Sequence, residues 1–155
     1  MTGWRVGFTA SNKAIAKAMS SIQSHATSNP NSIAQEATIA ALTGGLDCVE
    51  EMKKEFVKRR DYMVDRINGM DLVSCRKPQG AFYIMMNISK VMGMELYGVK
   101  INNADDFAEL FLEKAKVAVV PGTGFEAPEY VRWSYATAME NCKEGLDRLE
   151  KFLKG

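Results

Sequence analysis

Apolar side chains recur every three or four residues along several stretches of this chain, the spacing that puts them on one face of a helix. Asn12, a residue type favoured at helix N-caps, stands directly before the first stretch. The segments Ser28–Asn31 and Gly44–Gly45 interrupt the pattern. The spacing therefore predicts helices over residues 12–26, 33–42, 46–67 and 139–153, and a further helix that begins at residue 103.

Shorter apolar runs, bounded by glycine, proline or asparagine, have the length of strands. They predict strands over residues 4–10, 72–76, 81–88, 117–120 and 130–135. Along the last strand, alternation places Val131, Trp133 and Tyr135 on one face, and Arg132 with Ser134 on the other. The order of elements after about residue 70 predicts an α+β domain, in which a small mixed or antiparallel sheet carries helices on one face and follows a long linking helix.

Composition and charge exclude several classes of protein. Hydrophobic residues make up 46% of the chain and charged residues 25%, as in ordinary globular domains. The 20 basic and 19 acidic residues nearly balance, which argues against nucleic-acid binding. No apolar run approaches the roughly 18 residues of a membrane span. Because Cys48, Cys75 and Cys142 are widely spaced and His25 is the single histidine, we expect no metal site, and free thiols in a reducing cytoplasm.

Two arginines and one loop are candidates for anion binding. Arg5 follows a glycine and precedes a short apolar run, and Arg132 lies in the middle of a predicted strand, where a carboxylate ligand would satisfy it. The segment Pro121–Phe125 is a glycine-rich loop after a strand. From spacing alone, simpler interpretations are favoured: an exposed arginine at position 5, a structural salt bridge or exposed sheet face at position 132, and a plain turn over residues 121–125.

Five segments of the chain form an ordered set, and it covers essentially the whole sequence. They are Met1–Gly7, Ser28–Gln35, Pro78–Tyr83, Val119–Phe125 and Val131–Thr137. Together they resemble successive segments of class I aminotransferases, the aspartate aminotransferase family. Met1–Gly7 is similar to the segment just after the lysine that binds the cofactor, and Val131–Thr137 to the strand that bears the substrate-binding arginine.

The resemblance implies an enzyme that uses pyridoxal 5'-phosphate (PLP) to move an amino group from aspartate or a related amino acid to a 2-oxo acid, as a cytoplasmic homodimer. It implies that Arg5 binds the cofactor phosphate and that Arg132 binds the substrate α-carboxylate through a bidentate pair of hydrogen bonds. Ser28 and Asn29 are expected near the dimer interface and the edge of the neighbouring active site. Residues 1–44 are expected to be a remnant of the large PLP-binding domain, and residues 45–155 the linking helix and the small C-terminal domain.

The chain departs from the family pattern in two places. In the family, the cofactor lysine stands four residues before the position of Met1, and no lysine of this chain takes its place. The isolated chain is therefore expected to be inactive and not to bind PLP. Ser24 stands where long-known aspartate enzymes of the family have an arginine for the substrate side chain. Specificity for dicarboxylic substrates therefore does not follow from this position.

A second hypothesis is that the chain is a stand-alone, non-catalytic α+β module that binds a partner protein or a small carboxylate through Arg132. It is supported by the helix predicted over residues 33–42, which is apolar nearly all round and invites a partner. The DNA just upstream separates the two hypotheses. A reading frame that encodes Ser-Lys-x-Tyr-Ala before Met1 favours the aminotransferase, whereas a clean start signal favours the module.

Overall fold

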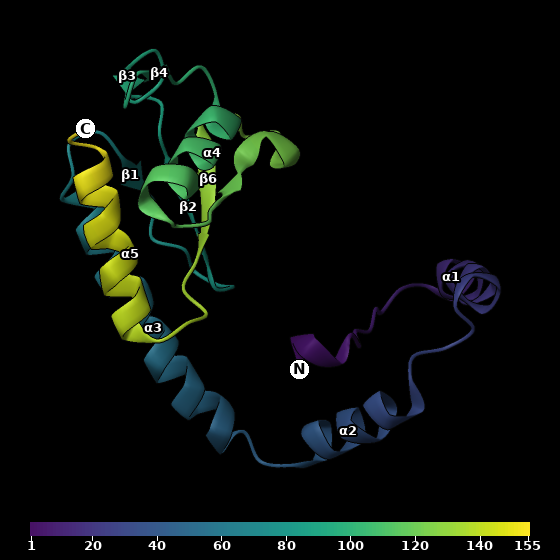
Figure 1. Ribbon diagram of the computed structural model, residues 1–155. Coiled ribbons are helices and arrows are strands. Elements are labelled where there is room, and N and C mark those ends of the chain that lie inside the picture. The colour runs from purple at the N-terminus through teal and green to yellow at the C-terminus, as the bar shows by residue number, and fades with distance from the viewer. The chain divides into compact units, whose positions relative to one another are not determined.

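The computed structural model describes residues 1–155, which divide into two compact units, Met1–Val49 and Glu50–Gly155. Helices occur in both units, whereas all the strands lie in the second (Figure 1). The helix α3, Asp47–Asn68, begins in the first unit and continues in the second, as the pattern over residues 46–67 predicts. None of the helices is both long enough and apolar enough to cross a membrane.

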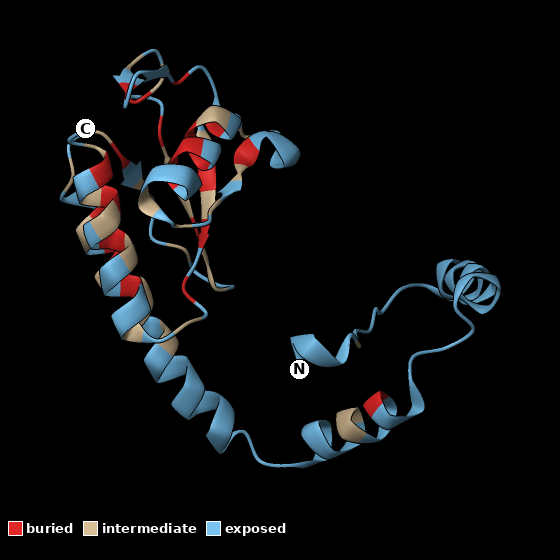
Figure 2. Cartoon of the chain, in the orientation of Figure 1, coloured by how far each residue is buried: buried red, intermediate tan, exposed pale blue.

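The first unit contains little besides helices. Its elements are the 3-10 helix η1 (Thr2–Trp4) and the α-helices α1 (Lys13–Ala26) and α2 (Ser32–Thr43). Both predicted α-helices are confirmed, and each begins after an asparagine cap. Asn12 Oδ1 accepts a hydrogen bond from Ile15 N at 3.0 Å, and Asn31 Oδ1 accepts one from Ile33 N at 2.9 Å. Only Ala34 is buried in this unit, so its helices are coloured almost entirely as exposed in Figure 2.

The strand predicted over residues 4–10 is wrong. Residues 2–4 form η1, and Arg5 follows in a left-handed backbone conformation with φ 54°. A strand needs a neighbouring strand for its backbone N–H and C=O groups, and all the strand pairs of this chain lie in the second unit. The apolar residues of this segment therefore have no sheet to join within the chain.

The second unit is built on a four-stranded antiparallel sheet with the order β1-β2-β6-β5. Its strands are β1 (Ser74–Cys75), β2 (Tyr83–Asn87), β5 (Val120–Pro121) and β6 (Tyr130–Ser134). The two central strands confirm the predictions over residues 81–88 and 130–135. The two edge strands are shorter than predicted, and β5 begins three residues later than expected. Pro121 suits an edge, because proline has no N–H to give to a further strand.

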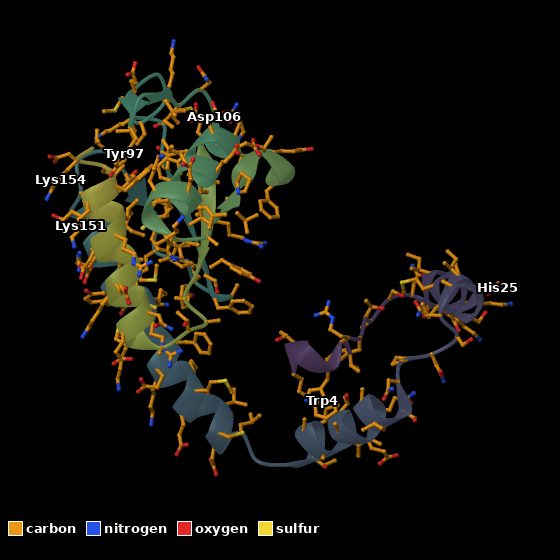
Figure 3. The ribbon with its side chains drawn as sticks, in the orientation of Figure 1. Trp4, His25, Tyr97, Asp106, Lys151 and Lys154 are labelled. Carbon is orange, nitrogen blue, oxygen red and sulfur yellow. The ribbon has the colours of Figure 1, made fainter.

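A small hairpin between the sheet and the next helix was not predicted. The strands β3 (Glu95–Leu96) and β4 (Val99–Lys100) pair antiparallel around Tyr97 and Gly98, both of which have positive φ. This is the backbone that a two-residue type I′ turn requires, so the glycine at its second position was the available signal. The Tyr97 ring stacks on Phe152, with ring centroids 5.5 Å apart, and holds the hairpin against the C-terminal helix (Figure 3).

Helices cover one face of the sheet. The helices α4 (Ala104–Ala115) and α5 (Met139–Phe152) confirm the predictions for these regions. They pack with the C-terminal half of α3 against Ile84, Met86, Val131 and Trp133, the inward residues of β2 and β6. Among the described residues, the core thus lies between this sheet face and the helices, and the α+β architecture with helices on one face is confirmed. The opposite face carries the alternate residues of the same strands, including Arg132.

Candidate functional site

Arg132 is placed by strand alternation on the face of the sheet that the helices leave uncovered. Its neighbours in β6, Val131 and Trp133, are 0% and 7% exposed, whereas Arg132 itself is half-buried. The strand register sets Met85 on β2 and Val120 on β5 directly beside it. Arg132 therefore lies in the middle of the sheet, flanked by apolar residues on both sides.

The guanidinium group of Arg132 lies close to two aromatic rings. Its Cζ atom is 4.4 Å from the centroid of the Tyr83 ring and 4.7 Å from that of Phe125. Both distances are within the range of cation–π attraction. No carboxylate of the chain lies within salt-bridge distance of Arg132, and its N–H groups make no hydrogen bond to the protein. The structural salt bridge considered from the sequence is thus not formed, and the planar fork of donors is open to an anionic ligand.

A set of polar contacts holds the segment that leads into β2. Asp61 Oδ1 accepts a hydrogen bond from Arg60 Nε at 2.8 Å, and it lies 2.9 Å from the ammonium group of Lys77. These two cations lower the pKa of the Asp61 carboxyl, with the hydrogen bond from Arg60 as the larger cause. The hydroxyl of Tyr135 donates to the carbonyl of Ala81 at 2.8 Å, and burial raises its pKa. The backbone directly before Tyr83 is therefore tied to both α3 and the end of β6.

The glycine-rich loop after β5 forms the 3-10 helix η2 (Gly122–Phe125). The turn expected over residues 121–125 is thus a tight helical turn, and it brings the Phe125 ring over Arg132. Gly122 meets a strict requirement, since a Cβ there would lie 2.1 Å from the carbonyl oxygen of Ala127. Through Phe125, this loop therefore supplies one of the two aromatic rings that lie close to the Arg132 guanidinium.

Arg5 lies in the first unit, exposed and at the end of η1. Its φ of 54° is the left-handed C-cap conformation that also ends α4 at Lys116 and η2 at Glu126. One guanidinium nitrogen donates to the carbonyl of Thr2 at 3.0 Å. Arg5 also lines a shallow hollow of about 340 Å³ together with Thr2, Val6 and Gly7. The remaining donors of Arg5 face no acidic partner.

Ser28 and Asn29 also lie in the first unit, at the turn after α1. Ser28 has φ 65°, and its N–H donates to the carbonyl of Gln23 at 3.0 Å, while Asn29 N donates to Thr27 O at 2.8 Å. Both side chains are exposed, as is His25 at the end of α1, labelled in Figure 3. Their predicted place near a dimer interface stays a prediction.

Tyr83 and Phe125 are site residues that were not predicted from the sequence. Tyr83 alternates with the buried Ile84, so its outward orientation could be inferred from the strand pattern. The sequence carries no such signal for Phe125, because Phe125 belongs to a loop whose path depends on Gly122 and on contacts outside the loop. Neither residue could be assigned to Arg132 without the register of β2 and β6 and the course of η2.

Comparisons with known proteins match almost the whole chain. Residues 1–149 match the family model described as aminotransferase class I and II. The chain is 43% identical to the aspartate aminotransferase of Geobacillus stearothermophilus over 154 residues, covering 99% of this chain and 38% of that protein. It is 45% identical to a probable aspartate/prephenate aminotransferase of Rickettsia bellii, covering 97% of this chain and 38% of that protein.

A solved structure is similar over the same length. The aspartate aminotransferase of Rhizobium meliloti superposes with a TM-score of 0.90 at 41% identity, and the match covers 99% of this chain and 39% of that one. The chain therefore spans less than two fifths of the length of these relatives.

Proposed function

Because the chain belongs to the class I and II aminotransferase family, we propose that it is the C-terminal portion of a PLP-dependent aminotransferase. The reaction would move an amino group from aspartate, or a related amino acid, to a 2-oxo acid, as the names of the relatives suggest. The single observation that supports this proposal best is Arg132: a guanidinium group clamped by two rings, with no acceptor from the protein.

Arg132 would bind the α-carboxylate of the amino acid. A carboxylate offers two coplanar oxygens, which match the two parallel N–H groups of the guanidinium fork. Two rings this close to the guanidinium carbon limit the rotation of the group. A carboxylate held at two points fixes the position and plane of that end of the substrate, which is one of the constraints that orient the bonds at Cα.

Arg5 would bind the cofactor phosphate. Its guanidinium has five N–H donors, one of which donates to the carbonyl of Thr2. Gly7 lies nearby, and no atom would lie within 4 Å of a Cβ added there, so the space beside it is open. This donor set and the hollow beside it fit a phosphate group. When bound, PLP supplies the electron-accepting ring that stabilises the carbanion formed at the substrate Cα. In this proposal, residues 1–44 are part of the large PLP-binding domain and residues 45–155 are the linking helix and small domain.

The experiment that tests the proposal measures carboxylate binding at Arg132. The side-chain Nε–Hε signal of Arg132 is followed by NMR in the 155-residue chain as succinate is added. We expect this signal to shift and Arg132→Lys to weaken binding by roughly tenfold or more, since lysine cannot form the paired hydrogen bonds. Arg76→Lys is the matched control, because Arg76 is exposed and forms no ion pair. An Arg132 signal that ignores succinate would contradict the proposal.

The 155-residue chain by itself is proposed to be inactive and not to retain PLP, since none of its lysines takes the place of the cofactor lysine of the family. Mixing the chain with PLP, L-aspartate and 2-oxoglutarate should form no oxaloacetate. Turnover by the purified chain would overturn this part of the proposal and leave the role of Arg132 in place.

The complete enzyme is proposed to be a homodimer, with Ser28 and Asn29 near the interface. The alternative function, a non-catalytic module that binds a partner protein or small carboxylate, is supported by exposed Ile33 and Leu42 on α2. A reading frame for Ser-Lys-x-Tyr-Ala directly upstream of Met1 favours the aminotransferase. A start signal at Met1 without that frame favours the module.

A further inference from the structure

The position of Phe125 over Arg132 needs an explanation, because burial does not hold it. Phe125 is 47% exposed and lies in a short turn at the surface. The turn is closed by backbone bonds from Ala127 N to Gly122 O at 3.0 Å and from Glu126 N to Thr123 O at 3.3 Å. These bonds fix the local shape of the turn, and the pairing of Pro121 with Val131 joins its start to the sheet.

One side-chain hydrogen bond joins this turn to a helix. The hydroxyl of Thr123 donates to Asp105 Oδ2 at 2.5 Å, across 18 residues of sequence. Asp105 lies in the first turn of α4, where an acid is also favoured by the helix dipole. The helix itself is anchored in the core by Phe107 and Phe111, both 0% exposed. The hydrogen bond between Asp105 and Thr123 therefore joins the turn to a helix that is anchored in the core.

We propose that Asp105 and Thr123 are positioning residues for Arg132, and that they act through Phe125. The core fixes α4, α4 carries Asp105, and Asp105 holds the turn so that the Phe125 ring covers one face of the guanidinium. The Tyr83 ring, on the neighbouring strand, lies 4.4 Å from the same guanidinium carbon. Neither Asp105 nor Thr123 contacts the guanidinium, and their effect is to hold its fork in one orientation before a ligand arrives.

Pre-organisation of this kind should be measurable in binding. A side chain that is already immobile loses less entropy when it binds, and losing one cation–π contact has an effect of similar size. Removal of the Thr123 hydroxyl should therefore weaken carboxylate binding at Arg132 by roughly three- to tenfold. This part of the inference rests on the proposed function, whereas the ordering of Arg132 in the free protein does not.

The test uses Thr123→Val, which keeps the shape of the side chain and removes the hydrogen bond. In the 155-residue chain, 15N relaxation of the Arg132 Nε–Hε group should report a more mobile side chain than in the wild type. Succinate should bind roughly three- to tenfold more weakly. Thr123→Ser keeps the hydroxyl and should restore both values. Glu109→Gln, an exposed change on α4 with no hydrogen bond to lose, is the control.

A double-mutant cycle separates action through Phe125 from a general effect on stability. In a Phe125→Leu background, where the ring is absent, Thr123→Val should add no further mobility to Arg132. Equal mobility and equal succinate affinity in Thr123→Val and the wild type would overturn the inference, and so would additive effects in the cycle. If succinate leaves the Arg132 signal unmoved in the wild type, the proposed function fails, and the relaxation measurements still decide whether Thr123 positions Arg132.

Discussion

Gly122 stands at the start of the turn that brings Phe125 to Arg132, and its lack of a side chain is a steric requirement. A Cβ at this position would lie 2.1 Å from the backbone oxygen of Ala127 and 2.5 Å from that of Tyr130. Both atoms belong to backbone that cannot move aside without distorting the entry into β6. At the scale of single residues, the course of this loop therefore depends on one glycine.

Gly122→Ala should destabilise the second unit by about 1–3 kcal/mol, because it forces the backbone of the loop apart. It should also release Phe125 and increase the mobility of the Arg132 side chain. Urea unfolding and side-chain relaxation measure the two effects. Gly124→Ala is the matched control: no atom lies within 4 Å of the added Cβ, so its stability should equal or slightly exceed that of the wild type. Equal stability of the Gly122 and Gly124 variants would contradict this account.

At the scale of elements, the N-cap of α4 matters more than that of α1. Asn103 Oδ1 accepts a hydrogen bond from Asp106 N at 2.9 Å and begins a helix with several buried residues. Asn12 makes the same kind of bond at the start of α1, a helix with no buried residue. A change at either cap destabilises the first turn of its helix. Only α4 has residues in a core, so only there does the change also lower the stability of a unit.

Asn103→Ala should therefore lower the free energy of unfolding of the second unit by about 1 kcal/mol. Asn12→Ala should reduce helical content in the first unit and leave the unfolding of the second unit unchanged. Circular dichroism during urea unfolding, combined with the fluorescence of buried Trp133 in a Trp4→Phe background, distinguishes the two responses. A shift of the Trp133 transition in the Asn12 variant, as large as in the Asn103 variant, would refute this distinction.

At the scale of the whole molecule, the two units differ in how much apolar surface they bury. The second unit has a continuous core, whereas the first buries Ala34 alone. In the first unit, Phe8 is 86% exposed, Ile33 68% and Leu42 70%. Large apolar side chains exposed together favour association, since covering them removes apolar area from water.

The isolated chain is therefore predicted to self-associate through the first unit. Light scattering should report a mass above the 17.2 kDa of one chain, with the excess growing with concentration. The double variant Ile33→Lys and Leu42→Lys should reduce the excess. Val99→Lys, at an exposed apolar residue of the second unit, should leave it unchanged. A wild-type chain that stays monomeric at every concentration would disprove the prediction.

The amino-acid sequence by itself determined the helices, their starting points and the orientation of Arg132 within its strand. These features depend on neighbours a few residues away: the helical spacing, the asparagine caps at Asn12 and Asn103, and the alternation around Trp133. The order of five sequence segments also identified the family. The strand predicted over residues 4–10 failed because a strand, unlike a helix, takes its hydrogen bonds from another segment.

Only the tertiary structure decided what surrounds Arg132. The pairing of β2 with β6 brings the Tyr83 ring to the guanidinium, and the turn that contains Gly122 and is joined to Asp105 brings the Phe125 ring to it. Strand register and loop path depend on the packing of segments that are far apart in the chain. A local sequence pattern does not indicate which distant segment will pack beside it. The position of Arg132 could therefore be predicted from the sequence, whereas the two rings beside it could be identified only from the structure.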